Sequence, residues 1–142
     1  MRTMTIENGG ETYELAATFK ASLEIADKVA DPLTIAREAA LEAAMLGARI
    51  PYQPKFMFSV RNVPVILHAG MKAAGAELKL AEVEEMVFEA GFVTARMWAA
   101  DYLALIVEPK PHKPEVEPED EYAEDDQATA KNVQGSKRGK AE

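Results

Sequence analysis

The chain has 142 residues, of which 48% are hydrophobic, and its formal net charge is −8. This length and composition fit one domain with a substantial core, and the acidic balance argues against nucleic-acid binding, which needs a basic face to neutralise phosphates. Cysteine is absent, which excludes disulfides and thiolate metal sites. The first residues contain no apolar signal-peptide core, and no apolar run reaches the length of a membrane span. We therefore expect a cytoplasmic protein.

The N-terminal residues predict a β-hairpin. Two short runs that contain β-formers, 3–7 and 11–15, flank the sequence Asn-Gly-Gly. Asn and Gly adopt the positive φ angles that tight hairpin turns need. Residues 55–60 alternate Phe56, Phe58 and Val60 with Met57 and Ser59. This alternation favours a third strand beside the hairpin, and the alternative is that the segment leads into the next helix.

Five helices are predicted after the hairpin, with boundaries set by capping residues, Pro and Gly. Their ranges are 18–29, 32–46, 62–74, 81–90 and 92–107. Asp31 and Pro32 supply an N-cap and a first-turn proline for the second of these. The last helix, FVTARMWAADYLALIV, is apolar on almost every side, so we expect it to be the central helix, buried or covered by a partner. Phe92 and Trp98 are expected to anchor the core.

Residues 108–142 differ in composition from the rest of the chain. Four prolines fall within ten residues, and 115–126 contain eight acidic and no basic residues. Such a segment buries too little apolar surface to offset its ordering entropy. We therefore expect a folded domain over 1–107 and a disordered, Pro-rich acidic tail over 108–142. The predicted fold class is α+β, with the hairpin, and a third strand if 55–60 forms one, packed on a bundle of about five helices.

No residue pattern predicts a catalytic, cofactor or metal site. A Ser-His-Asp set, a nucleophile elbow and a carboxylate–His metal spacing are all missing from the sequence. His68 lies among large apolar residues, where packing is the more common role. Glu82, Glu84 and Glu85 are more typical of a solvated helix face than of a cation site, because adjacent helix positions point in different directions. We expect a protein that is not an enzyme.

The last two helices instead suggest a surface for a protein partner. Met side chains adapt to irregular apolar partners, and the alternative is that they fill gaps in the core. Arg96 and Asp101 interrupt the apolar helix; they can mark its solvent edge or a groove for the partner. The candidate partner-binding residues are therefore Met86, Met97, Arg96 and Asp101.

Several short motifs occur in an informative order over about residues 5–107. They are Tyr13 and Leu15 in the hairpin, the pair Leu23-Glu24, the run ILHAGM over 66–71, and LAEVEEMV over 80–87. In this order they resemble the small tail-assembly-chaperone family found in gene transfer agents and related long-tailed phages. That family shows a hairpin, a helix with a Leu-Glu pair, a helix with an Ala-Gly step and a Glu-containing apolar helix.

The resemblance implies a tail assembly chaperone that binds the tape-measure or tail-tube protein in the bacterial cytoplasm before the phage tail forms. We expect no cofactor, and the acidic charge and the short apolar runs lead us to expect neither nucleic acid nor a membrane as partner. The alternatives are a structural tail component that remains in the virion and an adaptor domain unrelated to phages. The presence of the protein in purified particles distinguishes the structural component from the chaperone.

Overall fold

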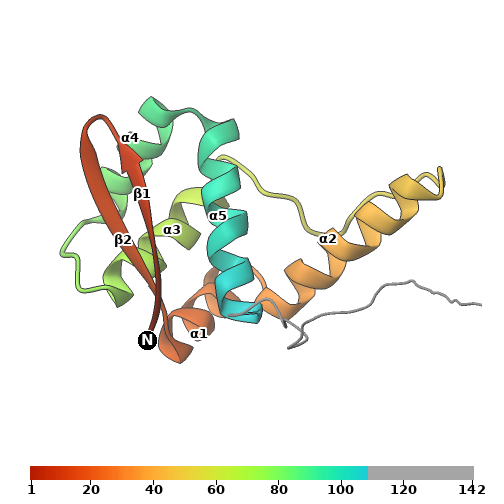
Figure 1. The fold of residues 1–142 in the computed structure, drawn as a ribbon, viewed down its shortest axis with the longest axis horizontal. Coiled ribbons are helices and arrows are strands. Elements are labelled where there is room, and N and C mark those ends of the chain that lie inside the picture. Colours follow the sequence, from red (N-terminus) through yellow and green to blue (C-terminus); the bar gives the residue numbers. More distant parts are fainter. Residues whose placement is uncertain (109–142) are drawn as a thin grey trace, which may run out of the picture. The chain divides into compact units, whose positions relative to one another are not determined.

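The computed structural model describes residues 1–108, which form a two-stranded antiparallel hairpin and five helices (Figure 1). The α+β prediction is therefore confirmed. The elements are β1 (Arg2–Asn8), β2 (Glu11–Ala17), α1 (Phe19–Lys28), α2 (Pro32–Gly47), α3 (Asn62–Ala73), α4 (Leu80–Ala90) and α5 (Phe92–Val107). The expected disordered tail lies, apart from Glu108, outside the described residues.

The hairpin forms where the turn residues predict it. Gly9 and Gly10 link the strands with φ angles of 61° and 82°, which a two-residue type I′ turn requires. The register pairs Met4 with Leu15 and Ile6 with Tyr13. Because side chains alternate across a strand, one face of the hairpin packs on the helices, with Ile6 and Leu15 fully or nearly fully buried.

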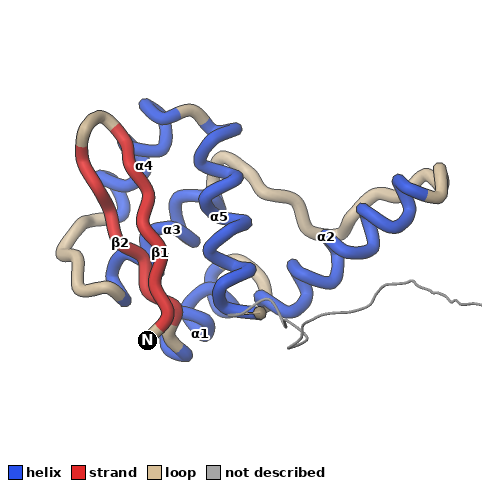
Figure 2. The backbone as a smooth tube through the Cα atoms, in the orientation of Figure 1, coloured by secondary structure: helices blue, strands red, loops and turns tan. Residues whose placement is uncertain are grey.

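The prediction of a third strand over 55–60 is wrong, because this segment is a loop (Figure 2). Phe56 and Phe58 pack edge to face, with ring centroids 5.2 Å apart, and both are half-buried against the core. Their alternation thus reflects packing onto the helices rather than strand pairing. The alternative holds: Ser59 and Asn62 exchange hydrogen bonds, from Ser59 N to Asn62 Oδ1 at 2.7 Å and from Asn62 N to Ser59 Oγ at 3.1 Å, and so start α3.

The central helix is α3 rather than α5. It contacts β2, α1, α4 and α5, and its fully buried side chains include Ile66, Leu67 and Met71. By contrast, α5 buries only Ala95, Ala99, Tyr102 and Leu103. An almost entirely apolar helix therefore leaves part of its apolar surface exposed, which fits the alternative that a partner covers it rather than burial within the domain.

Close contact between α3 and α5 depends on Gly70. A Cβ atom at this position would lie 2.8 Å from Cζ of Tyr102. The Tyr102 hydroxyl donates a hydrogen bond to the Ala16 carbonyl of β2 at 2.6 Å, and burial raises the pKa of Tyr102 to about 12. Phe92 and Trp98, the expected anchors, are only half-buried at the edge of the core. Tyr102 is the fully buried aromatic residue of α5.

α2 is attached mainly through its first half. Only Pro32, Ile35 and Glu38 are buried on this helix. The Glu38 carboxylate accepts hydrogen bonds from Lys55 N at 2.8 Å and from Tyr52 Oη at 2.7 Å. These hydrogen bonds hold the pKa of Glu38 below its ordinary value, and they fix the loop between α2 and α3 alongside α2.

Candidate partner-binding site

The four partner-binding candidates do not form one surface. Met86 is only 7% exposed and packs in the core, whereas Met97 on α5 is 59% exposed. Arg96 and Asp101 are both exposed, but they are five positions apart and therefore project from different sides of the helix. Asp101 follows Met97 by one turn, and Arg96 borders a surface hollow that is described below. The structure thus leaves Met97 and Arg96 as accessible parts of a possible site and places Met86 inside the fold.

Sequence reasoning missed the largest exposed apolar side chains near these residues. Val60, Phe88 and Val93 are 64%, 69% and 69% exposed. We call the group formed by Val60, Phe88, Phe92, Val93 and Met97 the α4–α5 patch. A sequence signal for Phe88 existed, because it lies off the helical stripe of Val83, Met86 and Val87 that is buried.

Gly91 brings the two helices of the patch together. Its φ angle is 97°, a conformation that favours glycine, and the chain bends there by 120° between α4 and α5. As a result, Phe88 in the last turn of α4 meets Phe92 in the first turn of α5, with ring centroids 6.2 Å apart in an edge-to-face contact. Phe88 and Phe92 therefore meet at the corner between α4 and α5, and Val60 reaches the same hollow from the loop before α3.

Two open hollows lie over the patch. One has a volume of about 740 Å³ and is bordered by Val60, Arg61, Glu84, Phe88 and Phe92 among others. The second, of about 410 Å³, shares Val60 and Phe92 and is also bordered by Phe58, Val93 and Arg96.

Two positive charges border these hollows. Within residues 1–108, neither the Arg61 nor the Arg96 guanidinium has an acidic partner within 4.0 Å. The larger hollow also has the Glu84 carboxylate at its border, whereas Arg96 is the charged side chain in the described lining of the smaller one.

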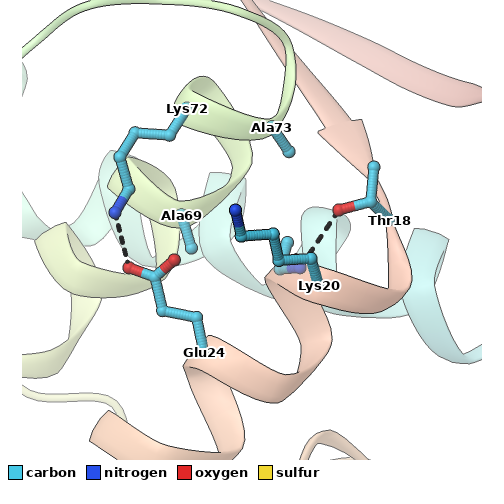
Figure 3. A pocket seen from close by; sticks show the side chains of 7 residues that line it. Thr18, Lys20, Glu24, Ala69, Lys72 and Ala73 are labelled. Atoms are coloured by element: carbon cyan, nitrogen blue, oxygen red, sulfur yellow. Dashed lines mark hydrogen bonds and ion pairs between the residues drawn. The ribbon is translucent and has the colours of Figure 1, made fainter.

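A smaller, polar pocket lies between α1 and α3, with an ion pair between Glu24 and Lys72 beside it (Figure 3). It has a volume of about 140 Å³ and is lined by Thr18, Lys20, Glu24 and Lys72 among others. Glu24 accepts hydrogen bonds from Lys72 at 2.8 Å and from Lys28 at 3.1 Å. Partial burial alone would raise the pKa of Glu24, but the two ammonium groups lower it overall. The pair Lys72–Glu24 therefore joins α3 to α1 at this pocket, and Lys28–Glu24 is a pair within α1.

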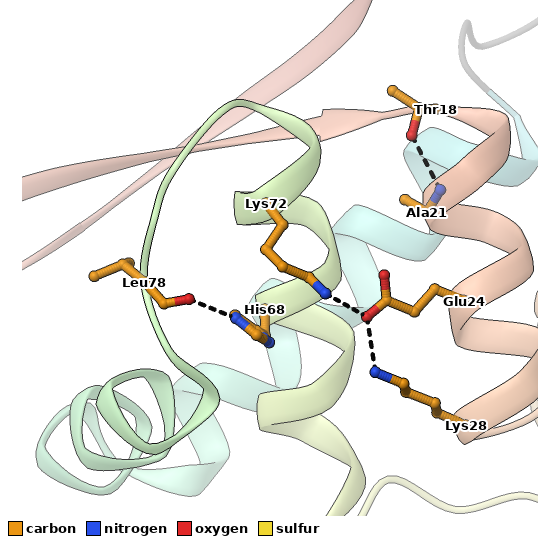
Figure 4. A network of polar contacts seen from close by, with 7 residues as sticks. All are labelled: Thr18, Ala21, Glu24, Lys28, His68, Lys72 and Leu78. Carbon is orange, nitrogen blue, oxygen red and sulfur yellow. Dashed lines mark hydrogen bonds and ion pairs between the residues drawn. The ribbon is translucent and has the colours of Figure 1, made fainter.

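The motif residues behind the family resemblance also have structural roles. His68 Nε2 lies 2.7 Å from the Leu78 carbonyl oxygen and fixes the connection from α3 to α4 (Figure 4). Glu24 joins two helices, and Gly70 allows Tyr102 to pack closely. These residues stabilise the fold, so a candidate partner surface is sought among the exposed side chains.

Comparison of the chain with protein-family models, curated proteins and solved structures gave no match. Within residues 1–108, no group of three or more His, Asp or Glu side chains is arranged to hold a metal ion. In the same part of the chain no single helix could cross a membrane; α4 and α5 together reach the required length and composition, but only as a bent pair. Among the surfaces described above, the α4–α5 patch has the geometry that best fits a binding site.

Proposed function

We propose that this protein is a tail assembly chaperone, which binds the tape-measure or tail-tube protein in the bacterial cytoplasm and releases it when the phage tail is built. The observation that carries the proposal is the α4–α5 patch, where Val60 of the loop before α3, Phe88 of α4, and Val93 and Met97 of α5 are all more than half exposed. Contiguous apolar surface of this kind marks protein interaction sites. The tail protein as client is supported by the order of motifs alone.

The size of the patch suits reversible binding. Burying one Val, Phe or Met side chain contributes about 1.5–3 kcal/mol, so four such side chains contribute roughly 6–12 kcal/mol. Association costs an estimated 4–15 kcal/mol in lost freedom. The patch alone therefore gives at most moderate affinity, as a chaperone that must release its client requires. Covering such a client also protects apolar helices and open sheet edges from aggregation.

The test is co-expression with the candidate tape-measure protein. The variant Phe88→Glu places a charge in the patch, and Phe19→Glu makes the same change on α1 at a side chain of similar exposure, 79% against 69%. We expect wild type and Phe19→Glu to keep the client soluble and Phe88→Glu to fail, with all three folded by circular dichroism. Equal insolubility of the client with and without wild type would overturn the proposal. Purified particles should lack the protein, whereas a structural tail component would remain in them.

A further inference from the structure

A third hollow extends the patch along α5. It has a volume of about 340 Å³ and lies between α2 and α5. Its walls are formed largely by the small side chains Ala36, Ala39 and Ala40 of α2 and Ala100 and Ala104 of α5, with Phe58 also lining it.

The three hollows adjoin one another. Phe58 lines both this hollow and the one of about 410 Å³, and Val60 and Phe92 line that one and the hollow of about 740 Å³. We call the three neighbouring hollows together the α5 furrow.

The walls of the furrow favour a helix as occupant. α5 has 16 residues, so the furrow that follows it is about 24 Å long, the length of a helix of roughly four turns. Alanine walls let a neighbouring helix axis approach to about 8–10 Å. An extended peptide would need hydrogen-bond partners for its backbone, and the furrow offers mostly apolar side chains. A helix satisfies its own backbone and needs only an apolar stripe.

The charges at one end of the furrow specify the occupant further. Arg61 and Arg96 border the hollows at the α4 end, and neither is paired within the described residues. Glu84 shares the hollow of Arg61, so Arg96 is the cation whose hollow has no carboxylate in its described lining. Guanidinium groups bind carboxylates through two parallel hydrogen bonds. Carboxylates that flank the apolar stripe of a bound helix would pair with them.

From this geometry we propose that the α5 furrow binds one amphipathic helix of about four turns, with carboxylates at the end that meets Arg61 and Arg96. The inference rests on the proposed function, since the helix would be a segment of the client. A second copy of this chain and the chain's own acidic residues 115–126 are the competing occupants, and the experiment below separates them from the client.

The experiment uses the full-length protein and two fluorescein-labelled helical peptides of 16 residues. Both carry the same Leu and Ala stripe; one has Glu residues beside the stripe at one end, and the other has Lys in their place. Fluorescence anisotropy should show the Glu peptide binding about tenfold more tightly, the effect of roughly 1.4 kcal/mol. Arg96→Glu should reverse the preference, and Ala100→Glu should abolish binding of both peptides. Lys20→Glu and Thr94→Glu, which alter exposed residues outside the furrow, should bind as wild type does.

Several outcomes would overturn the inference. Equal binding of the two peptides to wild type would refute the carboxylates proposed to meet Arg61 and Arg96. Unchanged binding to a folded Ala100→Glu would show that the helix does not bind in the furrow. A dimer in sedimentation velocity that Ala100→Glu abolishes would assign the furrow to a second copy. Competition by a synthetic peptide of residues 115–126 as effective as that of the Glu peptide would assign it to the chain's own acidic segment. If the peptides fail while Phe88→Glu still loses client rescue, the furrow is refuted and the chaperone function stands.

Discussion

Replacing Gly70 by Ala tests the close packing of α3 against α5. The added Cβ would lie 2.8 Å and 2.9 Å from two ring atoms of Tyr102 and 3.0 Å from Cδ2 of Leu15. Favourable carbon contacts need about 3.5–4.0 Å, so the ring would have to move by roughly 0.7–1.2 Å. It has little room to do so, because Tyr102 is fully buried and its hydroxyl is bonded to Ala16.

The expected loss follows from two opposing effects. Overpacking a core costs about 1–3 kcal/mol, and replacing a helical glycine by alanine gains about 1 kcal/mol. Since both neighbours are held in place, we expect a net loss of about 1–2 kcal/mol. For a folded region of this size the melting temperature should fall by roughly 5–15 °C, measured by circular dichroism.

Gly47→Ala is the matched control, because nothing lies within 4 Å of a Cβ built at that helical position. It should leave the melting temperature unchanged or raise it. A Gly70→Ala protein as stable as wild type would refute the packing argument.

Three further predictions concern single side chains. Met86→Glu should destabilise the fold by about 3–5 kcal/mol in urea unfolding, since it buries an unpaired carboxylate. Met97→Glu, at a 59% exposed position, should change stability by about 0.5 kcal/mol or less. Equal losses for the two variants would contradict the buried placement of Met86 and the exposed placement of Met97. Tyr102→Phe should cost about 1–2 kcal/mol, because a buried hydrogen bond to Ala16 is lost; no loss would show that this bond contributes nothing. The pKa of Glu38 is below its ordinary 4.5, so the contribution of the ionised carboxylate to stability is present above pH 4.5 and is lost as the pH falls through the lower folded-state pKa. Glu38→Gln should therefore flatten the acid limb of a pH–stability curve. An unchanged acid limb would exclude this role.

The elements that sequence reasoning placed correctly have strong local signals. Gly9 and Gly10 adopt the positive φ angles of the hairpin turn. Asp31 accepts a hydrogen bond from Leu33 N and Pro32 begins α2, as an N-cap followed by a first-turn proline predicts. Such signals act over a few residues, so they can be read without knowing the tertiary structure.

The features that were missed depend on contacts distant in sequence. Alternation over 55–60 fits a strand and a loop equally well, and the choice depends on whether a neighbouring strand is available to pair with. The sequence of α5 predicted a central helix, buried or covered by a partner, whereas α3 takes the central position and packs closely on α5 where Gly70 meets the Tyr102 ring. Helical periodicity from Val83 placed Met86 on the buried stripe, which argued against its choice as a partner-binding residue.

The site itself could be anticipated only in part. Within the last helix, the sequence indicates Met97 as an adaptable apolar side chain and Arg96 as a polar interruption of an apolar helix. Both side chains are exposed in the structure. The contribution of Val60 and Phe88 requires the loop before α3 and the bend at Gly91 to bring separate segments together. No local pattern encodes that juxtaposition, so the patch became visible only in three dimensions.

Site-specific photo-crosslinking tests the central claim, that the α4–α5 patch binds a tail protein, most directly. A benzophenone amino acid would replace Phe88 in one full-length variant and Phe19 in another, each co-expressed with the phage tail proteins and irradiated in cells. We expect the Phe88 position to give a covalent product that contains the tape-measure or tail-tube protein and the similarly exposed Phe19 position to give none. Crosslinking of the tail protein at Phe19 alone, or at neither position while the client remains soluble, would contradict the account.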